Sequence, residues 1–544
     1  MSKVAHYLQE HLQGEVMTST DARRYFATDG SILQLAPALV AYPRIENDVR
    51  KAARFSWQLA ERGRIIPITA RGSGTDKTGA ALSSGIILVF PAHMNRVLEI
   101  DTKADSVTVE PGIIYSKLQQ TLHTHGRFLP PYPATIEYST VGGAIANNLS
   151  GEKSVKYGDT LAYVKSLRVV LANGEVIETG RVSKKELSKK MGLATFEGEI
   201  YRSIDTLLEE QHELLSQLER GVTKNNAGYN LIDIKQKDGS FDLTPLIVGS
   251  QGTLGIITEA VLKTEAHNPQ TTLMLAQFDS LEQLQTAVLE LKELKEPPSA
   301  IEFVNDRALK EVHKLNPNQI KGIMDQPFPA VSLIVEFDDA ERKVKKAAKR
   351  ASRIFEKYAV ALETAEDSER QQQLWKLRQS VSSLISHNEG QQRAVPVIED
   401  AAVPVERLRE YIEGIYGILE SNRLSSALWG HAGDGNLHMQ PHLNVGQVGD
   451  RQKAFRLLDE YNKLVLKLGG TISSEAGEGR LKAPYLESMY GSEVYELFKK
   501  IKIIFDPYGT LNPGVKFGTS VDDLKSMIRQ EYSHDHLYDH MPRS

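Results

Sequence analysis

The chain of 544 residues is 41% hydrophobic and 25% charged, with a formal net charge of −5. This is the composition of a globular protein, and it provides no basic field that would favour nucleic acids. The chain contains no cysteine, which excludes disulfides, cysteine nucleophiles, thiolate metal sites and protein-ligated iron–sulfur clusters. Redox chemistry would therefore need a bound organic cofactor, or a metal held by nitrogen and oxygen ligands.

No apolar run approaches the ~20 residues that a membrane span requires. The first residues also lack the apolar core of a signal peptide. We expect a cytoplasmic protein, with peripheral attachment to a membrane left open. The length predicts two to four domains.

The first 32 residues read as a polar, helical leader. Residues 33–266 then change to short β-rich runs separated by glycine and proline, with an amphipathic helix at 46–62 and a buried strand at 64–69. Asn173-Gly174 stands between two apolar runs and predicts a β-hairpin. We assign residues 33–266 to a first domain.

The strand at 64–69 runs into a loop at 71–79 that is rich in Gly, Ser and Thr. Such a loop exposes successive backbone N–H groups, which can bind an anion. Two familiar motifs do not fit, because Asp76 stands where a P-loop needs glycine, and Lys77 stands where the dinucleotide fingerprint needs its last glycine. A nucleotide-phosphate cradle of another kind and a plain glycine-rich hairpin remain as interpretations.

Two more turns of small residues follow, at 142–148 and 249–255. Small residues allow a flat ligand to lie against the backbone. Each turn alone could be a tightly packed corner, but three such turns in one β-rich domain favour a single extended ligand that contacts all of them.

From residue 267 strands and helices alternate, which predicts a second domain at 267–470 with an antiparallel sheet and helices on one side. We assign residues 471–518 to a C-terminal segment. Residues 519–544 read as a polar tail, in which His534, His536 and His540 are expected to be solvated rather than to bind metal.

Residues 428–441 place two histidines, an aspartate and an asparagine among three glycines. Strand-like flanks would hold this turn rigidly, so His431 and His438 can point at one place, as a metal or acid–base site requires. Glu475 lies in another glycine-rich turn, which favours a site over two hydrogen-bonded loop histidines. A His-His-Glu set suits Zn²⁺, with Mn²⁺ or Fe²⁺ as alternatives.

These runs, in this order, resemble the FAD-linked oxidases of the vanillyl-alcohol-oxidase superfamily, in the branch of the D-lactate, glycolate and D-2-hydroxyglutarate dehydrogenases. The resemblance covers residues 33–518 and rests on motifs that include Arg-Gly-Ser-Gly-Thr at 71–75, Thr-Val-Gly-Gly at 140–143, Gly-Ser-Gln-Gly-Thr-Leu-Gly-Ile-Ile-Thr at 249–258 and Gly-His-Ala-Gly-Asp-Gly-Asn-Leu-His at 430–438. It implies an α+β fold. A two-subdomain FAD-binding domain of the PCMH type would span 33–266, a substrate (cap) domain with an antiparallel sheet 267–470, and a C-terminal segment would return to the flavin at 471–518.

The resemblance implies non-covalent FAD, since no histidine or cysteine stands in the diphosphate loop or its nearby turns. The residues that it implies for FAD binding are Arg71, Gly72, Ser73, Gly74, Thr75, Gly79, Pro131, Thr135, Thr140, Gly142, Gly143, Asn147, Asn148, Ser150, Tyr157, Gly252, Ile257 and Asn512. It also implies a divalent metal on His431, His438 and Glu475. Arg378 would hold the substrate carboxylate, and Asn436 is counted with the catalytic residues.

The most important departure from the family is Ala476, which stands where the family usually has a histidine after the metal-binding glutamate. That histidine is the expected general base, and loss of a general base typically costs ~10²–10⁴-fold in rate. Glu478 and His442 are the side chains that could replace it. Ile398 stands where some relatives place a carboxylate-binding lysine, and Gln251 replaces a usual glutamate.

The sequence therefore predicts an FAD-dependent dehydrogenase that oxidises a D-2-hydroxy acid, of the D-lactate, D-2-hydroxyglutarate or glycolate type, to the 2-oxo acid. Hydride would pass to the flavin with the metal assisting. Two alternatives are a homologue that binds FAD and metal but is impaired by Ala476, and a flavin oxidase of another alcohol. The reduced flavin would pass electrons to a separate quinone, cytochrome or electron-transfer flavoprotein. We expect a monomer or dimer without a nucleic-acid partner.

Overall fold

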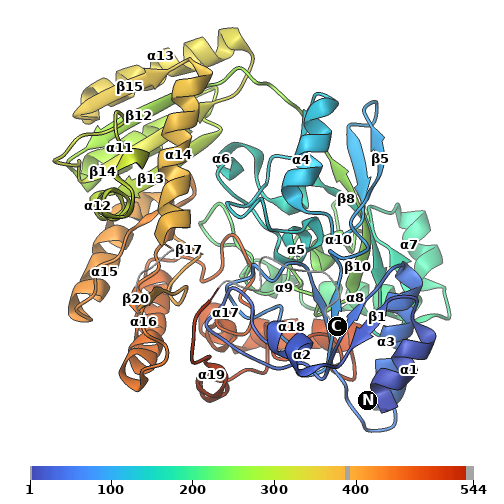
Figure 1. Cartoon of the computed structure of the whole chain (residues 1–544). Helices are drawn as coiled ribbons and strands as arrows, with labels where there is room; N and C mark the ends of the chain where they lie inside the picture. Colours follow the sequence, from blue (N-terminus) through green and yellow to red (C-terminus); the bar gives the residue numbers. More distant parts are fainter. Residues whose placement is uncertain (1–2, 386–391, 534–544) are drawn as a thin grey trace.

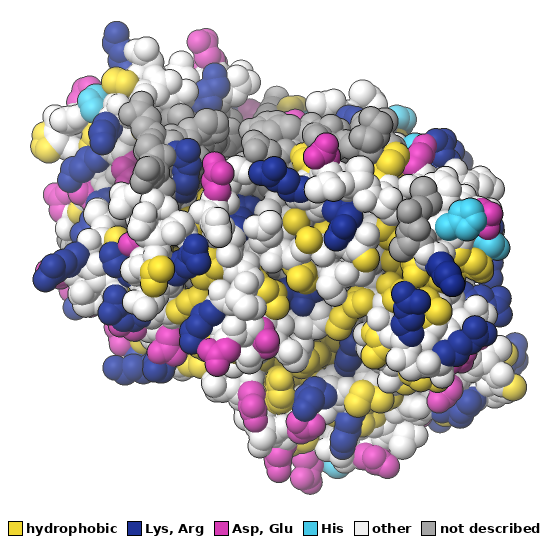
Figure 2. Space-filling view, turned by 60° about the horizontal axis from the view of Figure 1, so that its bottom comes forward, with side chains coloured by type: hydrophobic (Ala, Val, Ile, Leu, Met, Phe, Trp, Pro, Cys, Tyr) yellow, Lys and Arg dark blue, Asp and Glu magenta, His cyan; other side chains and the backbone are white. Residues whose placement is uncertain are grey.

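The computed structural model describes residues 3–385 and 392–533, and it contains a first unit and a cap unit (Figure 1). The first unit is drawn in blue to green and the cap unit in yellow-green to orange, and the red C-terminal helices lie in the lower part of the view, between the orange end of the cap unit and the blue N-terminal helices. Among the described residues no helix is both long and apolar enough to cross a membrane. Basic and acidic side chains are intermixed over much of the face shown in Figure 2.

The first unit begins with a four-stranded sheet in the order β1-β2-β4-β3. β2, β4 and β3 are parallel, and β1 pairs antiparallel with β2. Every residue of β2 and β4 is buried, as expected for parallel strands covered on both faces. The elements are α1 (Lys3–His11), β1 (Glu15–Met17), α2 (Thr20–Tyr25), β2 (Leu39–Tyr42), α3 (Glu46–Ala60), β3 (Ile68–Arg71) and β4 (Ile86–Val89).

A second, antiparallel sheet completes the first unit in the order β5-β6-β10-β8-β9. Its strands are β5 (Val97–Asp101), β6 (Ser106–Val109), β8 (Val164–Val170), β9 (Val176–Glu178) and β10 (Ile256–Lys263), and the short pair β7 (Arg127–Phe128) and β11 (Glu265–Ala266) lies apart from it. Its helices are α4 (Tyr115–Thr124), α5 (Val141–Asn147), α6 (Ser154–Tyr157), α7 (Lys184–Met191), α8 (Phe196–Glu210), α9 (His212–Leu215) and α10 (Thr244–Ile247).

The cap unit is a seven-stranded antiparallel sheet in the order β15-β12-β14-β13-β18-β19-β17. Its strands are β12 (Thr272–Phe278), β13 (Ala300–Asn305), β14 (Val331–Phe337), β15 (Ala361–Ala365), β17 (Ala401–Ala402), β18 (Trp429–His431) and β19 (Asn436–His438), with β16 (Arg393–Ala394) and β20 (His442–Leu443) as a separate pair. Its helices are α11 (Leu281–Lys292), α12 (Asp306–Leu315), α13 (Glu341–Tyr358), α14 (Ser368–Ile385), α15 (Leu408–Ser421) and α16 (Val448–Lys467). The expected α+β class with an antiparallel sheet is confirmed.

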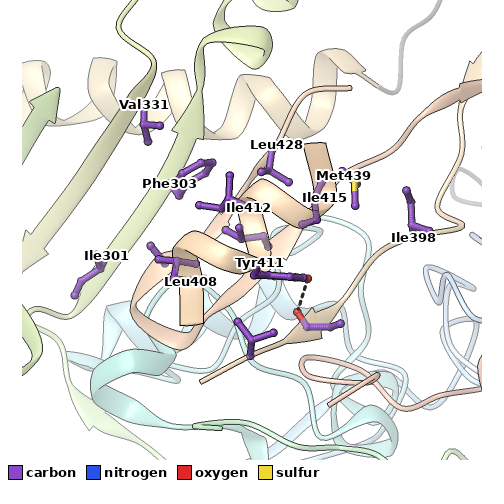
Figure 3. Packing of buried hydrophobic residues seen from close by; sticks show 14 of the residues in the cluster. Ile301, Phe303, Val331, Ile398, Leu408, Tyr411, Ile412, Ile415, Leu428 and Met439 are labelled. Carbon is purple, nitrogen blue, oxygen red and sulfur yellow. Dashed lines mark hydrogen bonds between the residues drawn. The ribbon is translucent and has the colours of Figure 1, made fainter. Parts of the chain in front are cut away.

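Helices cover both faces of the cap sheet, so the expectation of helices on one side was wrong. Alternate residues of β12 and β14 enter two different apolar clusters, one with α11, α13, α15 and α16 and one with α12 and α14. All seven residues of β14 are buried, and such a strand needs cover on both faces. Figure 3 shows the first cluster, where Leu408, Ile412 and Ile415 of α15 pack near Phe303 of β13.

The chain then returns to the first unit. α17 (Leu486–Tyr490) and α18 (Ser492–Phe505) contribute to the same apolar cluster as α8, and Leu511 bridges to Ile68 of β3. This return agrees with the C-terminal segment expected from the sequence.

Residues 519–533 are not the polar tail that the sequence suggested. α19 (Val521–Met527) starts with a capping box between Ser520 and Asp523, and Leu524 is completely buried. Ile528 then bridges to Leu33. The sequence of this short helix is mostly polar because Leu524 is its single buried residue. His534, His536 and His540 lie outside the described residues.

Replacing Leu524 with alanine tests whether this segment belongs to the folded core. Removing a fully buried leucine side chain typically costs about 2–5 kcal/mol, so the denaturation midpoint should fall clearly. The exposed neighbour change Lys525→Ala should alter stability by no more than about 0.5 kcal/mol. Equal midpoints for both variants would show that the segment does not pack as described.

Candidate functional site

A cavity of about 420 Å³ lies where the first unit, the cap unit and the C-terminal segment meet. Residues within 70–78, 139–147 and 250–257 line it, and the second of these segments is mostly helix α5 rather than the turn expected from the sequence. The cap unit supplies Arg378, Trp429, His431 and His438, and the C-terminal segment supplies Glu475. All three glycine-rich turns and the histidine hairpin therefore face one space.

The three turns approach each other closely because their glycines lack side chains. A Cβ atom on Gly72 would lie 2.2 Å from Thr140 Oγ1, and one on Gly249 would lie 3.3 Å from Asn148 Cβ. The hydroxyl of Ser73 is buried and has no hydrogen-bond partner among the described residues. A cradle of backbone with an unpartnered donor fits a ligand rich in acceptor oxygens.

Two-thirds of the residues expected to bind FAD line this cavity: Arg71, Gly72, Ser73, Gly74, Thr75, Thr135, Thr140, Gly142, Gly143, Asn147, Gly252 and Ile257. The guanidinium of Arg71 is used elsewhere, because it donates to the carbonyls of Phe26 and Thr28 and lies over the Phe26 ring. It ties the N-terminal segment to the loop.

The other expected FAD residues lie behind the cavity wall. Asn148 ends α5 with a φ of 48°, and its side chain donates to Asp159 and Asn226. Asn512 donates to the carbonyls of Ala80 and Gln251. Tyr157 donates to Asp338 of the cap unit, and the Pro131 carbonyl accepts from Tyr115. Gly79 has a φ of 80°, and the Ser150 side chain is buried.

Strand pairing brings the two histidines together. In the hairpin, His438 pairs with Trp429, and His431 lies two residues beyond Trp429 on the same face. The ring centroids of the histidines are 5.4 Å apart. Glu475 completes a cluster whose possible ligand atoms all lie within 4.8 Å of one another, so two nitrogens and a carboxylate oxygen can meet one cation.

The Nδ1 atom of each histidine lies beside a buried carboxylate. Glu302 stands opposite His431 across the β13–β18 pair, with Oε1 2.7 Å from Nδ1. Glu399 Oε1 lies 3.4 Å from Nδ1 of His438. Such partners fix the orientation of metal-binding imidazoles. The Nε2 atoms both face Glu475, at 2.6 Å from His431 and 3.4 Å from His438.

These carboxylates determine the charge of the cluster. Burial would lower the pKa of His431, but Glu302 and Glu475 raise it to about 9. Burial would raise the pKa of Glu475, but the two histidines hold it well below its usual range. Lys77 and His438 likewise outweigh burial at Glu399 and lower its pKa to about 2. The protein itself therefore favours protonated histidines and ionised carboxylates.

Sequence reasoning missed Glu302, Glu399 and the residues that hold Glu475. Asp400 accepts from the backbone N–H groups of Glu475 and Ala476, at 2.7 and 3.0 Å. The buried ammonium of Lys224 lies 3.8 Å from Glu475. A signal was present for Glu302, because an acidic residue inside the apolar strand β13 needs a partner.

Arg378 is brought to the metal cluster by Glu302, which accepts from its Nε at 2.8 Å. Its Nη1 is buried and has no hydrogen-bond partner among the described residues. A carboxylate ligand would satisfy this donor.

The other predicted catalytic residues do not line the cavity. Glu478 is fully buried and pairs with Lys516 at 2.9 Å. His442 is half-buried in β20, where burial lowers its pKa. Asn436 donates to the Ala401 carbonyl. Ala476, by contrast, does line the cavity. Neither Glu478 nor His442 is among the residues that line this cavity.

Comparisons with known proteins find relatives over both units of the chain. The family model "FAD binding domain" matches residues 37–180, and "FAD linked oxidases, C-terminal domain" matches residues 267–515. The chain is 30% identical to a D-2-hydroxyglutarate dehydrogenase of Pantoea ananatis over 97% of its own length, but it spans only about half of that relative (52%). It is also 30% identical to the glycolate oxidase subunit GlcD of Bacillus subtilis, covering 83% of this chain and 84% of the relative.

Among solved structures, p-cresol methylhydroxylase with substrate bound superposes with a TM-score of 0.70. The sequence identity is 15%, and the match covers 96% of this chain and 97% of the other. This likeness shows the fold.

Glu478→Gln tests whether Glu478 is structural. The change leaves the Lys516 ammonium buried without a counter-charge, which typically costs about 3–5 kcal/mol, so the denaturation midpoint should fall. Adding Lys516→Met should recover much of the loss. Glu478 would instead be assigned a role as proton acceptor if the variant kept its stability and the rate of flavin reduction no longer rose with pH.

Metal binding should weaken as the pH falls below 9. A metal takes the neutral imidazole, so it must displace the proton that His431 holds up to a pKa of about 9. The apparent affinity for Zn²⁺ should fall by roughly tenfold per pH unit from 9 to 7. Competition with a chelating dye at several pH values measures it.

His431→Ala is the control for that titration. The variant should lose Zn²⁺ binding but keep FAD, because the glycine-rich turns come from the first unit. Retained metal in the variant, or an affinity independent of pH, would show that His431 is not a ligand.

Proposed function

Because this chain belongs to the FAD-linked oxidases, we propose that it oxidises a D-2-hydroxy acid to the 2-oxo acid. Hydride would go to FAD held by the three glycine-rich turns. His431, His438 and Glu475 would hold a divalent metal. Zn²⁺ is the preferred candidate, with Mn²⁺ or Fe²⁺ as alternatives. The relatives named D-2-hydroxyglutarate dehydrogenase and glycolate oxidase subunit support this reaction class.

One observation carries the proposal: the His431–His438–Glu475 cluster and Arg378 line the same cavity as the FAD-binding turns. A metal site elsewhere in the fold would have no access to the flavin. The ligand atoms of the cluster also fit a cation. The Nδ1 atoms of both histidines already contact carboxylates, which leaves the Nε2 atoms to bind the metal.

The substrate carboxylate would bind to the unpartnered Nη1 of Arg378, while Glu302 holds the guanidinium in place. The substrate hydroxyl would face the histidine cluster, where a bound metal supplies Lewis acidity and FAD accepts the hydride. Asp400 keeps the backbone of Glu475 in register with both histidines. These residues position C2 and its hydroxyl without themselves changing oxidation state.

The hydroxyl proton needs an acceptor, and no imidazole follows Glu475. The cavity-lining carboxylates Glu399 and Asp400 are engaged by Lys77 and by backbone N–H groups. We therefore assign the proton to water beside Ala476, which makes proton removal the slow step. This observation also favours a second candidate function, an FAD- and metal-binding protein that has lost efficient turnover. A flavin oxidase of another alcohol is the third candidate, and metal dependence would separate it.

The chain has no cysteine, so an iron–sulfur relay within it is excluded. We propose that the reduced flavin passes its electrons to a separate acceptor such as a quinone, a cytochrome or an electron-transfer flavoprotein.

Anaerobic mixing of the holoenzyme with D- and L-2-hydroxy acids tests the function, because reduction bleaches the flavin absorbance. We expect bleaching by a D-acid, dependent on metal. Ala476→His should raise the reduction rate by about 10²–10⁴-fold, since it restores a base to the turn.

Glu302→Gln is the comparison variant. It weakens the contacts that position Arg378 and His431, so it should slow flavin reduction both in the natural chain and in Ala476→His. Absence of bleaching in the natural chain with bleaching in Ala476→His would support the impaired homologue. Absence in both would reject the D-2-hydroxy acid reaction.

A further inference from the structure

Four basic side chains line the cavity in the described part of the chain: Arg71, Lys77, Arg378 and Lys482. Two of them are used by the fold. Arg71 donates to carbonyls of the N-terminal segment, and Lys482 donates to the carbonyls of Asp400 and Ile472. Lys77 instead contacts Glu399, and Arg378 contacts Glu302. Arg378 also keeps a buried Nη1 that has no hydrogen-bond partner among the described residues.

The loop that carries Lys77 positions its side chain to contact Glu399 of the cap unit. Asp76 accepts from the N–H groups of Thr78 and Ala80, which fixes the turn that carries Lys77. The Lys77 ammonium contacts Glu399, and its side chain stays 40% exposed while that of Glu399 is 7% exposed. An ammonium has three donors, and Glu399 is its one partner among the described residues.

Lys77 and Arg378 reach the metal cluster through different histidines. Arg378 pairs with Glu302 on the Nδ1 side of His431, and Lys77 pairs with Glu399 on the Nδ1 side of His438. The two cations therefore stand next to different histidines of the cluster, and both line the same cavity.

No cation comes from the neighbouring position 398. Ile398 is fully buried in the apolar cluster of the cap unit, close to Met439 in Figure 3. The cation at this end of the cavity is supplied by the first unit instead.

We propose that Lys77 binds a second acidic group of the substrate, so that the preferred substrate is a D-2-hydroxy dicarboxylic acid rather than a monocarboxylic one. The inference rests on the proposed function: the C1 carboxylate lies on Arg378, the C2 hydroxyl faces the metal cluster, and the distal carboxylate lies on Lys77. Lys77 is thus a specificity-determining residue, and charge-assisted hydrogen bonds give it the strength to discriminate.

Equilibrium binding tests this without turnover. The probes are 2-oxoglutarate and 2-oxovalerate, which share a five-carbon chain and differ in the distal carboxylate. Their Kd values on the oxidised holoenzyme are measured from the flavin spectrum and by calorimetry. We expect tighter binding of the diacid, and Lys77→Met should raise its Kd by about 10–100-fold while changing that of the monoacid by less than about threefold.

Lys77 also neutralises Glu399, so controls must separate a purely structural role of Lys77 from substrate recognition. If the role were purely structural, Lys77→Met would weaken the binding of both acids equally, by disturbing Glu399 and His438. Lys77→Arg should keep the preference for the diacid, and Glu399→Gln should keep it even if both Kd values rise. The double change Lys77→Met with Glu399→Gln removes the charge imbalance and should still lack the preference.

Equal binding of both acids by the natural chain, or equal losses in Lys77→Met, would overturn the proposal. Reduction by D-2-hydroxyglutarate and D-2-hydroxyvalerate is measured in parallel. A binding preference that depends on Lys77, in a protein that neither acid reduces, would reject the proposed reaction and leave the recognition role standing. Reduction of the flavin by both acids, with no binding preference that depends on Lys77, would support the proposed reaction and reject the recognition role of Lys77.

Discussion

The site depends on burying charge only in balanced pairs. Glu302 is fully buried between Arg378 and His431, and Glu399 lies between Lys77 and His438. An isolated carboxylate at either position would cost several kcal/mol of desolvation. Because each has a cation on one side and an imidazole on the other, the two histidines can keep fixed orientations in a region almost closed to water.

The same principle holds the two units at a fixed distance. Asp338 at the end of β14 accepts from Lys156 and Tyr157 of the first unit, and Lys153 contacts both Asp338 and Glu336. Across the cavity, the glycine-rich turns approach to distances that no Cβ atom would allow. The polar clamp sets the position of the histidine hairpin, and the glycines set the depth of the cradle opposite it. A flavin ring and a metal can share one space only if both conditions hold.

Much of this could be predicted from the sequence, because the signals are local. Glycine-rich turns after apolar strands, and histidines spaced along a hairpin, indicate their own geometry. The missing parts depend on pairing between distant segments. Nothing near Glu302 in the sequence indicates that it lies opposite His431, and nothing near Lys77 indicates Glu399. The helices on the second face of the cap sheet, and the packing of residues 519–533, were missed for a related reason. A polar helix with few buried residues resembles a solvated one until its neighbour is known.

Ala476 lies in a turn that is held by backbone hydrogen bonds. Asp400 binds the turn through the backbone N–H groups of Glu475 and Ala476, and Gln251 accepts from the N–H of Gly479. The Ala476 side chain takes no part in these bonds. The turn can therefore keep Glu475 in place whichever residue follows it. An intact cluster of His431, His438 and Glu475 beside Ala476 is therefore physically consistent. In the proposed reaction, the residue at position 476 can change without moving Glu475.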